Sequence, residues 1–192
     1  EKYVRRPRHI EVQVFGDSHG QVVHLFERDC SLQRRHQKVI EESACTLLDA
    51  GQEAEIRRAA AELCRRAGYT SAGTVEFLYA DGRNDFFFLE VNTRLQVEHG
   101  VTEEIHGIDL VEWMVLQAAG DLPSLDSFKV EPRGASIQAR VYAENPAREF
   151  QPSCGALTGA LFPSSAEARI ETWVERGVEV SPFYDPMLAK II

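Results

Sequence analysis

The sequence predicts an α+β fold, in which an antiparallel sheet with helices is followed by a mostly β unit. Apolar and polar residues alternate along residues 9–15, as in a strand, and apolar residues recur at helical spacing along residues 52–67. Beyond residue 134 the patterns are those of strands alone. Of the 192 residues 44% are hydrophobic and 27% are charged, so the chain has enough apolar residues for a core.

Two strands open the predicted sheet. Residues 9–15 have one apolar and one polar face, which is typical of a half-buried strand. A turn at residues 17–20 leads to an extended segment at residues 22–27, and we expect the two strands to form an antiparallel hairpin. The hairpin leads into a basic cluster, which is either a solvated loop or the binding site of an anionic group. The cluster contains Arg28, Arg34, Arg35, His36 and Lys38.

A helix and a second hairpin come next. The helix is predicted at residues 52–67 and ends at Gly68, a residue suited to a left-handed C-cap. Strands are predicted at residues 74–79 and 86–92, and a turn at residues 81–82 joins them.

The chain then changes character. A second helix is predicted between Asp109, as its N-cap, and Gly120. Residues 121–133 contain two prolines and two serines, which is typical of a linker, so we divide the chain into units of residues 1–120 and 134–192. The second unit has four segments with strand patterns, which are residues 135–143, 157–162, 169–174 and 187–192.

Charge and motifs exclude several classes of function. A formal net charge of −9 argues against a nucleic-acid partner, and no apolar run is long enough to cross a membrane. The four cysteines are irregularly spaced, which predicts free thiols and a cytoplasmic location. The sequence has no GxxxxGK[ST] phosphate loop and no HExxH zinc motif. It does not begin with Met and shows no signal peptide, so we expect a piece of a longer protein.

The segment richest in chemistry is LEVNTRLQVEH, residues 89–99. If it is extended, its polar residues share one face, which is either solvated or part of a site. Glu90 and Asn92, together with Glu76 on the neighbouring strand, would then offer oxygen ligands suited to magnesium. A carboxylate pair of the glycosidase type is the alternative, but it does not explain Arg94 on the same face.

The same segment predicts an anion site. Arg94 carries a planar fork suited to an oxyanion, Glu98 would act as a base, and Lys38 would add a point charge. Together these groups would hold a small planar anion. We expect His99 and His106 to be structural histidines.

Long, ordered motifs cover nearly the whole chain. They are EKY at Glu1, RHIEVQVFGD at Arg8, ERDCSLQRRHQKVIEE at Glu27, GTVEFL at Gly73, LEVNTRLQVEH at Leu89 and FYDPMLAKII at Phe183. These motifs resemble the biotin carboxylase component of biotin-dependent carboxylases, which are ATP-grasp enzymes. The resemblance implies that residues 1–120 form the C-terminal lobe of an ATP-grasp fold. It also implies that residues 134–192 form part of the mostly β biotin carboxylase C-terminal domain.

The resemblance implies roles for individual residues. The nucleotide-binding residues would be Glu1, Lys2, Tyr3, Val4, His9, Gln33, His36, Glu76, Leu78 and Glu90. The ligands of Mg²⁺ or Mn²⁺ would be Glu76, Glu90 and Asn92. Bicarbonate would be held by Lys38, Arg94, Gln96, Val97 and Glu98, and Arg140 would approach both bicarbonate and biotin. Of these residues, Lys38, Arg94, Glu98 and Arg140 would be catalytic.

The implied reaction is the ATP-dependent carboxylation of biotin. Bicarbonate loses a proton to Glu98 and takes the γ-phosphoryl group of ATP, and the resulting carboxyphosphate carboxylates biotin on a separate carrier domain. A carboxyltransferase domain is the further partner, and the family is compatible with an oligomer. The glycine-rich lid and the N-terminal subdomain of the family are not among these 192 residues, so we expect the chain alone to be inactive.

Some segments point to one branch of the family. These are VEHGVTEE at Val97, DLVEWM at Asp109 and ETWVERGVEVSP at Glu171, and they are most similar to urea carboxylases. An acyl-CoA or pyruvate carboxylase, another ATP-grasp ligase, and a non-catalytic fragment that keeps the fold are the alternatives.

Overall fold

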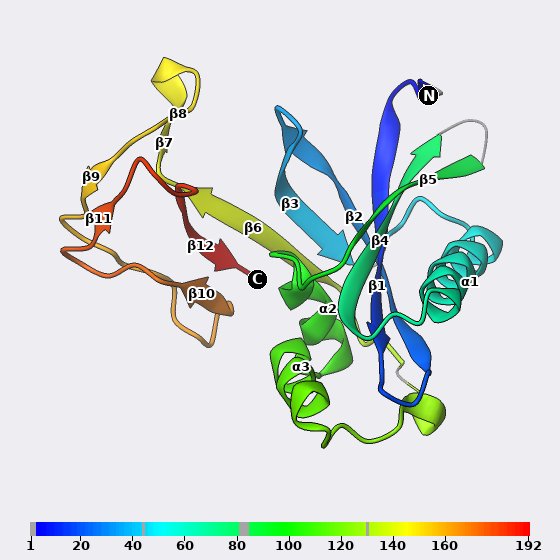
Figure 1. Ribbon diagram of the computed structural model, residues 1–192. Helices are drawn as coiled ribbons and strands as arrows, with labels where there is room; N and C mark the ends of the chain where they lie inside the picture. Colours follow the sequence, from blue (N-terminus) through cyan, green and yellow to red (C-terminus); the bar gives the residue numbers. More distant parts are fainter. Residues whose placement is uncertain (1–2, 44, 81–84, 130) are drawn as a thin grey trace. The chain divides into compact units, whose positions relative to one another are not determined.

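The computed structural model describes residues 3–43, 45–80, 85–129 and 131–192 (Figure 1). Its contacts divide the chain into two compact units, Glu1–Ile137 and Gln138–Ile192. The fold is α+β, as predicted, because the first unit combines an antiparallel sheet with helices and the second consists mainly of short strands. No helix in the described part of the chain is long and apolar enough to cross a bilayer.

The sheet of the first unit is antiparallel, with strand order β3-β2-β1-β4-β5. Its strands are β1 (Pro7–Gly16), β2 (Val22–Arg34), β3 (Gln37–Ser43), β4 (Ser71–Ala80) and β5 (Asp85–Asn92). The pairings of β1 with β2 and of β4 with β5 confirm both predicted hairpins. The predicted turn at residues 81–82 lies outside the described residues.

Strand β3 was not predicted, and it changes the basic cluster. Arg35 and His36 join β2 to β3 with φ values of 52° and 66°. Two consecutive positive φ angles are typical of a tight type I′ hairpin turn, which usually carries Asn or Gly, so no turn residue marked this one. Arg28 is buried in β2 and Lys38 lies in β3, so the cluster is not a single solvated loop.

Helix α1 (Ala50–Arg66) confirms the first predicted helix. It begins after Asp49, whose side chain accepts hydrogen bonds from the backbone of Gly51 and Gln52. The Gln52 side chain accepts from the Asp49 backbone, which completes a capping box. The helix packs its apolar side against β1, in a core that includes Ile10, Val12, Val14, Ile56 and Ala60.

Strand β1 is buried on both faces, and the prediction of a half-buried strand was wrong. Glu11 and Gln13, on its polar face, are 0% exposed. Helix α2 (His99–His106) covers this face, because the Thr102 hydroxyl accepts a hydrogen bond from the same Arg28 that binds Glu11. Since successive residues of a strand point to opposite sides, α1 and α2 lie on opposite faces of the sheet.

Helix α2 and the turn before it show that residues 89–99 are extended only as far as Asn92, so the condition under which their polar residues would share one strand face is not met. Strand β5 ends at Asn92, the chain turns through residues 93–98, and α2 begins at His99. The helix has eight residues and ends at Gly107, which has a left-handed φ of 64°. Two turns of helix are too few for a helical period to stand out from an alternating pattern.

Helix α3 (Leu110–Ala119) confirms the second predicted helix. It begins after Asp109, whose side chain accepts a hydrogen bond from the first turn, and it ends at Gly120 with φ 81°. The residues after α3 include the 3-10 helix η1 (Leu125–Ser127), whose first backbone amide donates to Asp17 at 2.9 Å. The predicted linker therefore begins as a segment packed on the first unit.

Short antiparallel strands make up the second unit, the first of which begins two residues before it. They are β6 (Ser136–Tyr142), β7 (Glu144–Asn145), β8 (Gln151–Pro152), β9 (Gly155–Ala156), β10 (Ile170–Thr172), β11 (Glu179–Val180) and β12 (Met187–Ile191), with the 3-10 helix η2 (Pro146–Arg148). Strand β12 pairs with β10 and β6, β9 pairs with β11, and β7 pairs with β8. Strands β6, β10 and β12 confirm three of the four predicted strands.

The strand predicted at residues 157–162 is wrong. Strand β9 ends at Ala156, and Leu161 is 99% exposed, so the apolar pattern of this segment does not reflect burial. Pro163 follows directly and has no N–H group with which to continue a ladder.

Candidate active site

Charged side chains form a row across four neighbouring strands of the sheet. Glu11 of β1 lies opposite both Arg28 of β2 and Glu76 of β4, and Glu76 lies opposite Glu90 of β5. Like charges that face each other across a ladder repel. Three carboxylates in one row therefore require cations beside them.

Lys38 of β3 supplies one cation. Its Nζ lies 2.5 Å from Glu11 Oε2, 3.0 Å from Glu76 Oε1 and 2.5 Å from Glu98 Oε1. Burial disfavours the charged ammonium, but the carboxylates, Glu11 foremost, outweigh burial and raise the pKa of Lys38. Because Glu98 directly precedes α2, this ammonium also connects the sheet to the helix.

Arg28 supplies the second cation and is 0% exposed. Its Nε donates to Glu11 Oε1 at 2.6 Å, and one terminal nitrogen donates to Gln13 Oε1 at 2.7 Å and Thr102 Oγ1 at 2.8 Å. Burial opposes the ionisation of Glu11, but Arg28 and Lys38, each bound to one of its oxygens, lower its pKa. The other terminal nitrogen of Arg28 reaches the side-chain oxygens of Thr74 at 3.3 Å and Gln96 at 3.5 Å.

Glu76 lies at the centre of the cluster. The amides of Gln96 and Asn92 donate to its Oε1 at 2.8 and 2.9 Å, and His9 Nε2 lies 2.8 Å from its Oε2. Burial opposes ionisation of this carboxyl group. The hydrogen bond with His9 and the charge of Lys38 outweigh burial and hold the pKa of Glu76 at about 2.

The predicted metal ligands lie together. Asn92 Nδ2 donates to Glu76 Oε1 at 2.9 Å and to Glu90 Oε1 at 3.3 Å, so the two carboxylates face one point. His9, Glu11 and Glu76 also bring ligand atoms within 4.8 Å of one another. Carboxylate and amide oxygens are the ligands that Mg²⁺ prefers, so this donor set fits a hard divalent cation.

The segment after β5 brings the predicted anion-binding residues to the cluster. Arg94 is exposed at the rim, and its guanidinium makes a long hydrogen bond of 3.4 Å to Asn92 Oδ1. Gln96 and Glu98 are buried, with the half-buried Val97 between them. The structure thus gathers the predicted bicarbonate-binding residues of the first unit, which are Lys38, Arg94, Gln96, Val97 and Glu98.

The predicted nucleotide-binding residues have varied surroundings. Tyr3 is 85% exposed and Val4 is half-buried, both ahead of β1. Gln33 and His36 are exposed at the β2–β3 hairpin, and Leu78 lies in β4 opposite His9. Glu1 and Lys2 lie outside the described residues, and Arg140 lies in β6 of the second unit, opposite Lys190 of β12.

Glu11 and Arg28 are central to the cluster, yet neither is among the metal-, nucleotide- or bicarbonate-binding residues predicted from the sequence. The alternation of β1 did place Glu11 on the same face as His9, and this was the available signal. A polar strand face usually points to solvent, so its burial could not be foreseen without α2. Arg28 was grouped with the basic loop, because β3 was not recognised.

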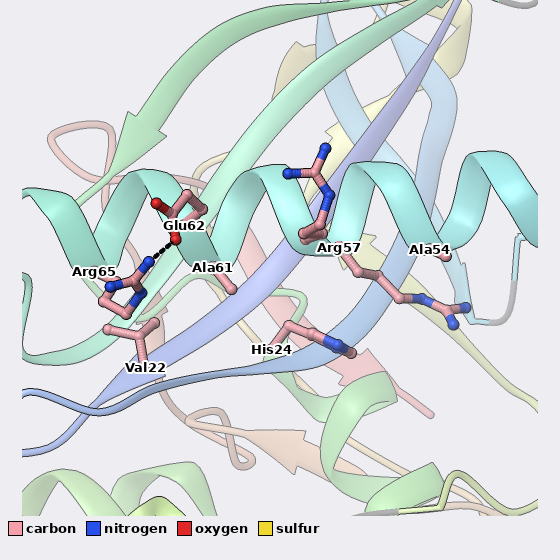
Figure 2. Close-up of a pocket in the computed structure, with 8 residues that line it drawn as sticks. Val22, His24, Ala54, Arg57, Ala61, Glu62 and Arg65 are labelled. Atoms are coloured by element: carbon pink, nitrogen blue, oxygen red, sulfur yellow. Dashed lines mark hydrogen bonds and ion pairs between the residues drawn. The ribbon is translucent and has the colours of Figure 1, made fainter.

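A surface pocket of about 440 Å³ lies between α1 and β2, away from this cluster (Figure 2). Figure 2 shows Glu62 of the pocket paired with Arg65, and Arg57 binds the buried Glu27 through hydrogen bonds of 2.5 and 2.9 Å. The described residues that line the pocket include none of the predicted site. They are Val22, His24, Ala54, Arg57, Arg58, Ala61, Glu62 and Arg65.

Two family models match the chain one after the other. Residues 1–125 match the family described as carbamoyl-phosphate synthase L chain, ATP binding domain, and residues 138–192 match the biotin carboxylase C-terminal domain. The chain belongs to the biotin carboxylase family.

Several relatives match this chain over its full length. Urea amidolyase of Saccharomyces cerevisiae is 53% identical over 192 residues, which are 100% of this chain and 10% of the relative. The mitochondrial methylcrotonoyl-CoA carboxylase subunit alpha of Glycine max is 50% identical over 100% of this chain and 26% of the relative. The chain thus spans about a tenth and about a quarter of these two proteins.

A solved biotin carboxylase domain has the same fold. It belongs to the 2-oxoglutarate carboxylase of Hydrogenobacter thermophilus, a dimer in complex with MgADP, ADP and bicarbonate. It matches with a TM-score of 0.93 at 41% identity, over 100% of this chain and 42% of that chain.

Proposed function

We propose that this chain forms the metal- and bicarbonate-binding part of an ATP-dependent biotin carboxylase, a ligase. The observation that carries the proposal is Lys38, whose ammonium lies within 3.0 Å of three carboxylates between the sheet and α2. A fully solvated strand face would not enclose such a cluster. The bicarbonate and MgADP complex of the related 2-oxoglutarate carboxylase domain supports the assignment of ligands.

Glu76, Glu90 and Asn92 would hold Mg²⁺ or Mn²⁺. Carboxylates outnumber cations in the cluster, since Glu11, Glu76 and Glu98 share Arg28 and Lys38 and Glu90 lies next to them. A divalent cation would balance this excess negative charge. When bound, it would neutralise charge on the phosphate oxygens of ATP.

Lys38, Arg94 and Gln96 would bind bicarbonate. Arg94 offers its planar fork at the rim of the cluster, where its described hydrogen bonds are long. Glu98 would take the proton of bicarbonate, and a bicarbonate oxygen would attack the γ-phosphorus of ATP. The bond between γ-phosphorus and ADP would break, which yields carboxyphosphate and ADP. Positioning and fixed charges dominate such transfers, and this cluster can supply both.

Biotin on a carrier domain would receive the carboxyl group of carboxyphosphate at its ureido nitrogen, while the bond between the carboxyl group and phosphate breaks and phosphate leaves with the proton of that nitrogen. Arg140, within QARVYAEN at Gln138, would stabilise the deprotonated ring, and this role rests on the resemblance of that segment. A carboxyltransferase domain would then transfer the carboxyl group to the final acceptor.

We propose urea as that acceptor. The identities of 53% to urea amidolyase and 50% to methylcrotonoyl-CoA carboxylase differ little, so the support comes from the motifs at Val97, Asp109 and Glu171. An acyl-CoA is the second candidate, on the strength of the 50% identity. A cytoplasmic location belongs to the same proposal and is supported by the free cysteines Cys30, Cys45, Cys64 and Cys154.

A chimaera tests the proposed function. This chain replaces the matching residues of the Saccharomyces cerevisiae urea amidolyase, and phosphate release from ATP is measured with and without bicarbonate. We expect turnover that requires Mg²⁺, bicarbonate and the biotinylated carrier domain. Glu98→Gln should lower it by about 10²- to 10⁴-fold, the usual contribution of a general base.

Glu55→Gln, an exposed carboxylate of α1, is the matched control and should leave turnover unchanged. A folded chimaera that is inactive would favour the non-catalytic alternative. Turnover that persists without bicarbonate would point to another ATP-grasp ligase. To test the acceptor, the protein that contains this chain is purified from its natural source and assayed with urea and with 3-methylcrotonoyl-CoA. We expect it to carboxylate urea and not 3-methylcrotonoyl-CoA.

A further inference from the structure

We propose that Arg28 is a positioning residue, which fixes Glu98 against Lys38 by clamping helix α2 to strand β1. The inference rests on the proposed function, because Glu98 and Lys38 act in the reaction proposed above. Arg28 itself would touch neither bicarbonate nor ATP.

The guanidinium of Arg28 joins the two elements directly. Its Nε donates to Glu11 Oε1 of β1 at 2.6 Å, and a terminal nitrogen donates to Thr102 Oγ1 of α2 at 2.8 Å. Thr102 lies four residues after Glu98, which is about one helical turn. A contact at Thr102 therefore sets the position of the end of α2 that carries Glu98.

The contacts form a closed ring. Glu11 binds Arg28 through Oε1 and binds Lys38 through Oε2 at 2.5 Å. Lys38 in turn donates to Glu98 Oε1 at 2.5 Å. The chain continues from Glu98 directly into α2, which contains Thr102 and so closes the ring. A shift of Arg28 would thus move both partners of the pair formed by Lys38 and Glu98.

Arginine suits this position in a way that lysine does not. Arg28 is 0% exposed and distributes its donors over oxygens of β1, β4, α2 and the segment before α2. A lysine ammonium would keep the charge but lacks the planar fork that reaches several elements at once. The described contact between Ser43 Oγ and the Val101 carbonyl also joins the sheet to α2, but it is 3.4 Å long.

Arg57 provides a matched control on the opposite face of the sheet. It lies in α1 and binds the buried carboxylate of Glu27, the residue of β2 next to Arg28. Arg57 also lines the pocket of Figure 2 and takes no part in the cluster. Each arginine thus binds a buried carboxylate, and although Arg57 itself is half-buried, only Arg28 faces the proposed site.

Amide hydrogen exchange of the full chain tests the clamp independently of catalytic activity. We expect Arg28→Lys and Thr102→Val to speed exchange in residues 93–106 by about tenfold or more, because each loses a hydrogen bond to a charged group. Thr102→Val removes one acceptor and keeps the buried arginine, so it remains informative if the Arg28 variant fails to fold. Arg57→Lys should speed exchange in α1 and leave residues 93–106 as in the wild type.

Kinetics of the chimaera then test positioning. Arg28→Lys should raise the KM for bicarbonate or lower kcat. We expect kcat/KM for bicarbonate to fall by about 10- to 100-fold, as it does for other residues that orient the binding side chains without contacting the ligand. The KM for ATP should stay near the wild-type value. Arg57→Lys should change none of these constants per folded molecule.

The results separate the two proposals. Unchanged exchange in residues 93–106 in both Arg28→Lys and Thr102→Val would overturn the clamp, whatever the activity. Equal kinetic losses in Arg28→Lys and Arg57→Lys would also overturn it, because they would reveal a general effect on folding. If Arg28→Lys and Thr102→Val speed exchange but the chimaera without these substitutions is inactive, the clamp would be supported and the proposed biotin carboxylase activity contradicted.

Discussion

Glu76 shows at the scale of one residue how folding and ionisation are coupled. Burial opposes its charge, but His9 and Lys38 hold its pKa at about 2, below the ordinary 4.5. A carboxylate with a lowered pKa stabilises the folded state above its unfolded pKa and loses that contribution as the pH falls through the folded pKa. The contribution of Glu76 should therefore be complete above pH 4.5 and fade towards pH 2.

A Glu76→Gln variant measures this contribution. At pH 7 we expect the free energy of unfolding to fall by about 1–3 kcal/mol, because hydrogen bonds to a charged group are lost. Urea denaturation should show the difference from the wild type shrinking as the pH drops below the ordinary carboxyl pKa. Glu55→Gln should leave the free energy of unfolding unchanged. A difference that stays constant with pH would mean that the pKa of Glu76 is the same in the folded and the unfolded chain.

Arg94 tests the assignment of the anion site. In the chimaera, Arg94→Ala should lower bicarbonate-dependent ATP turnover by about 10²- to 10³-fold, the typical cost of losing one preorganised donor. ATP affinity should hardly change, because the described contacts of Arg94 lie at the rim beyond Glu76 and Glu90. Arg58→Ala, in the exposed face of α1, is the control. Loss of ATP affinity with full turnover at saturation would place Arg94 in the nucleotide site.

Elements with a long, regular pattern could be predicted from the sequence. The strand period of residues 9–15 and the helix period of residues 52–67 have several repeats, and β1 and α1 confirm them. Short elements could not be predicted in this way. Helix α2 has only eight residues, and the turn between β2 and β3 is formed by Arg35 and His36, where glycine or asparagine is usual. Missing these two elements also hid the burial of Glu11 and Arg28, which depends on α2 and β3.

Gly16, the last residue of strand β1, allows a test of how closely this strand packs against the chain before β4. A Cβ on Gly16 would lie 2.0 Å from the Tyr69 carbonyl oxygen, which belongs to the backbone and cannot turn away. We expect Gly16→Ala to lower the free energy of unfolding by about 1–3 kcal/mol or more, as overpacking does. Gly159→Ala is the control, because a Cβ there would meet nothing within 4 Å. Equal stability of the two variants in thermal unfolding would contradict this close approach.

At the scale of the whole molecule, the cluster joins parts of the chain that are far apart in sequence. Arg28 and Thr102 are separated by 74 positions, and Lys38 and Glu98 by 60. Local patterns could suggest Lys38, Glu76 and Glu98 by their chemistry, and the family motifs placed them in one site. Which side chains bind one another depends on strand order and register, and these are set by pairings between distant strands.

These 192 residues contain the whole charged cluster but only part of what the proposed reaction needs. The cluster lies within the first unit, so we expect the purified chain to bind Mn²⁺, and Glu90→Gln to weaken that binding. Phosphate release from ATP should nevertheless stay at the level of a Glu98→Ala control. The 192 residues contain no glycine-rich phosphate loop, so water would remain around the γ-phosphate and ATP would be poorly oriented. Orientation alone contributes about 7–11 kcal/mol to such barriers. Turnover above the control, measured with ATP, Mg²⁺, bicarbonate and free biotin, would show that the cluster suffices for the reaction.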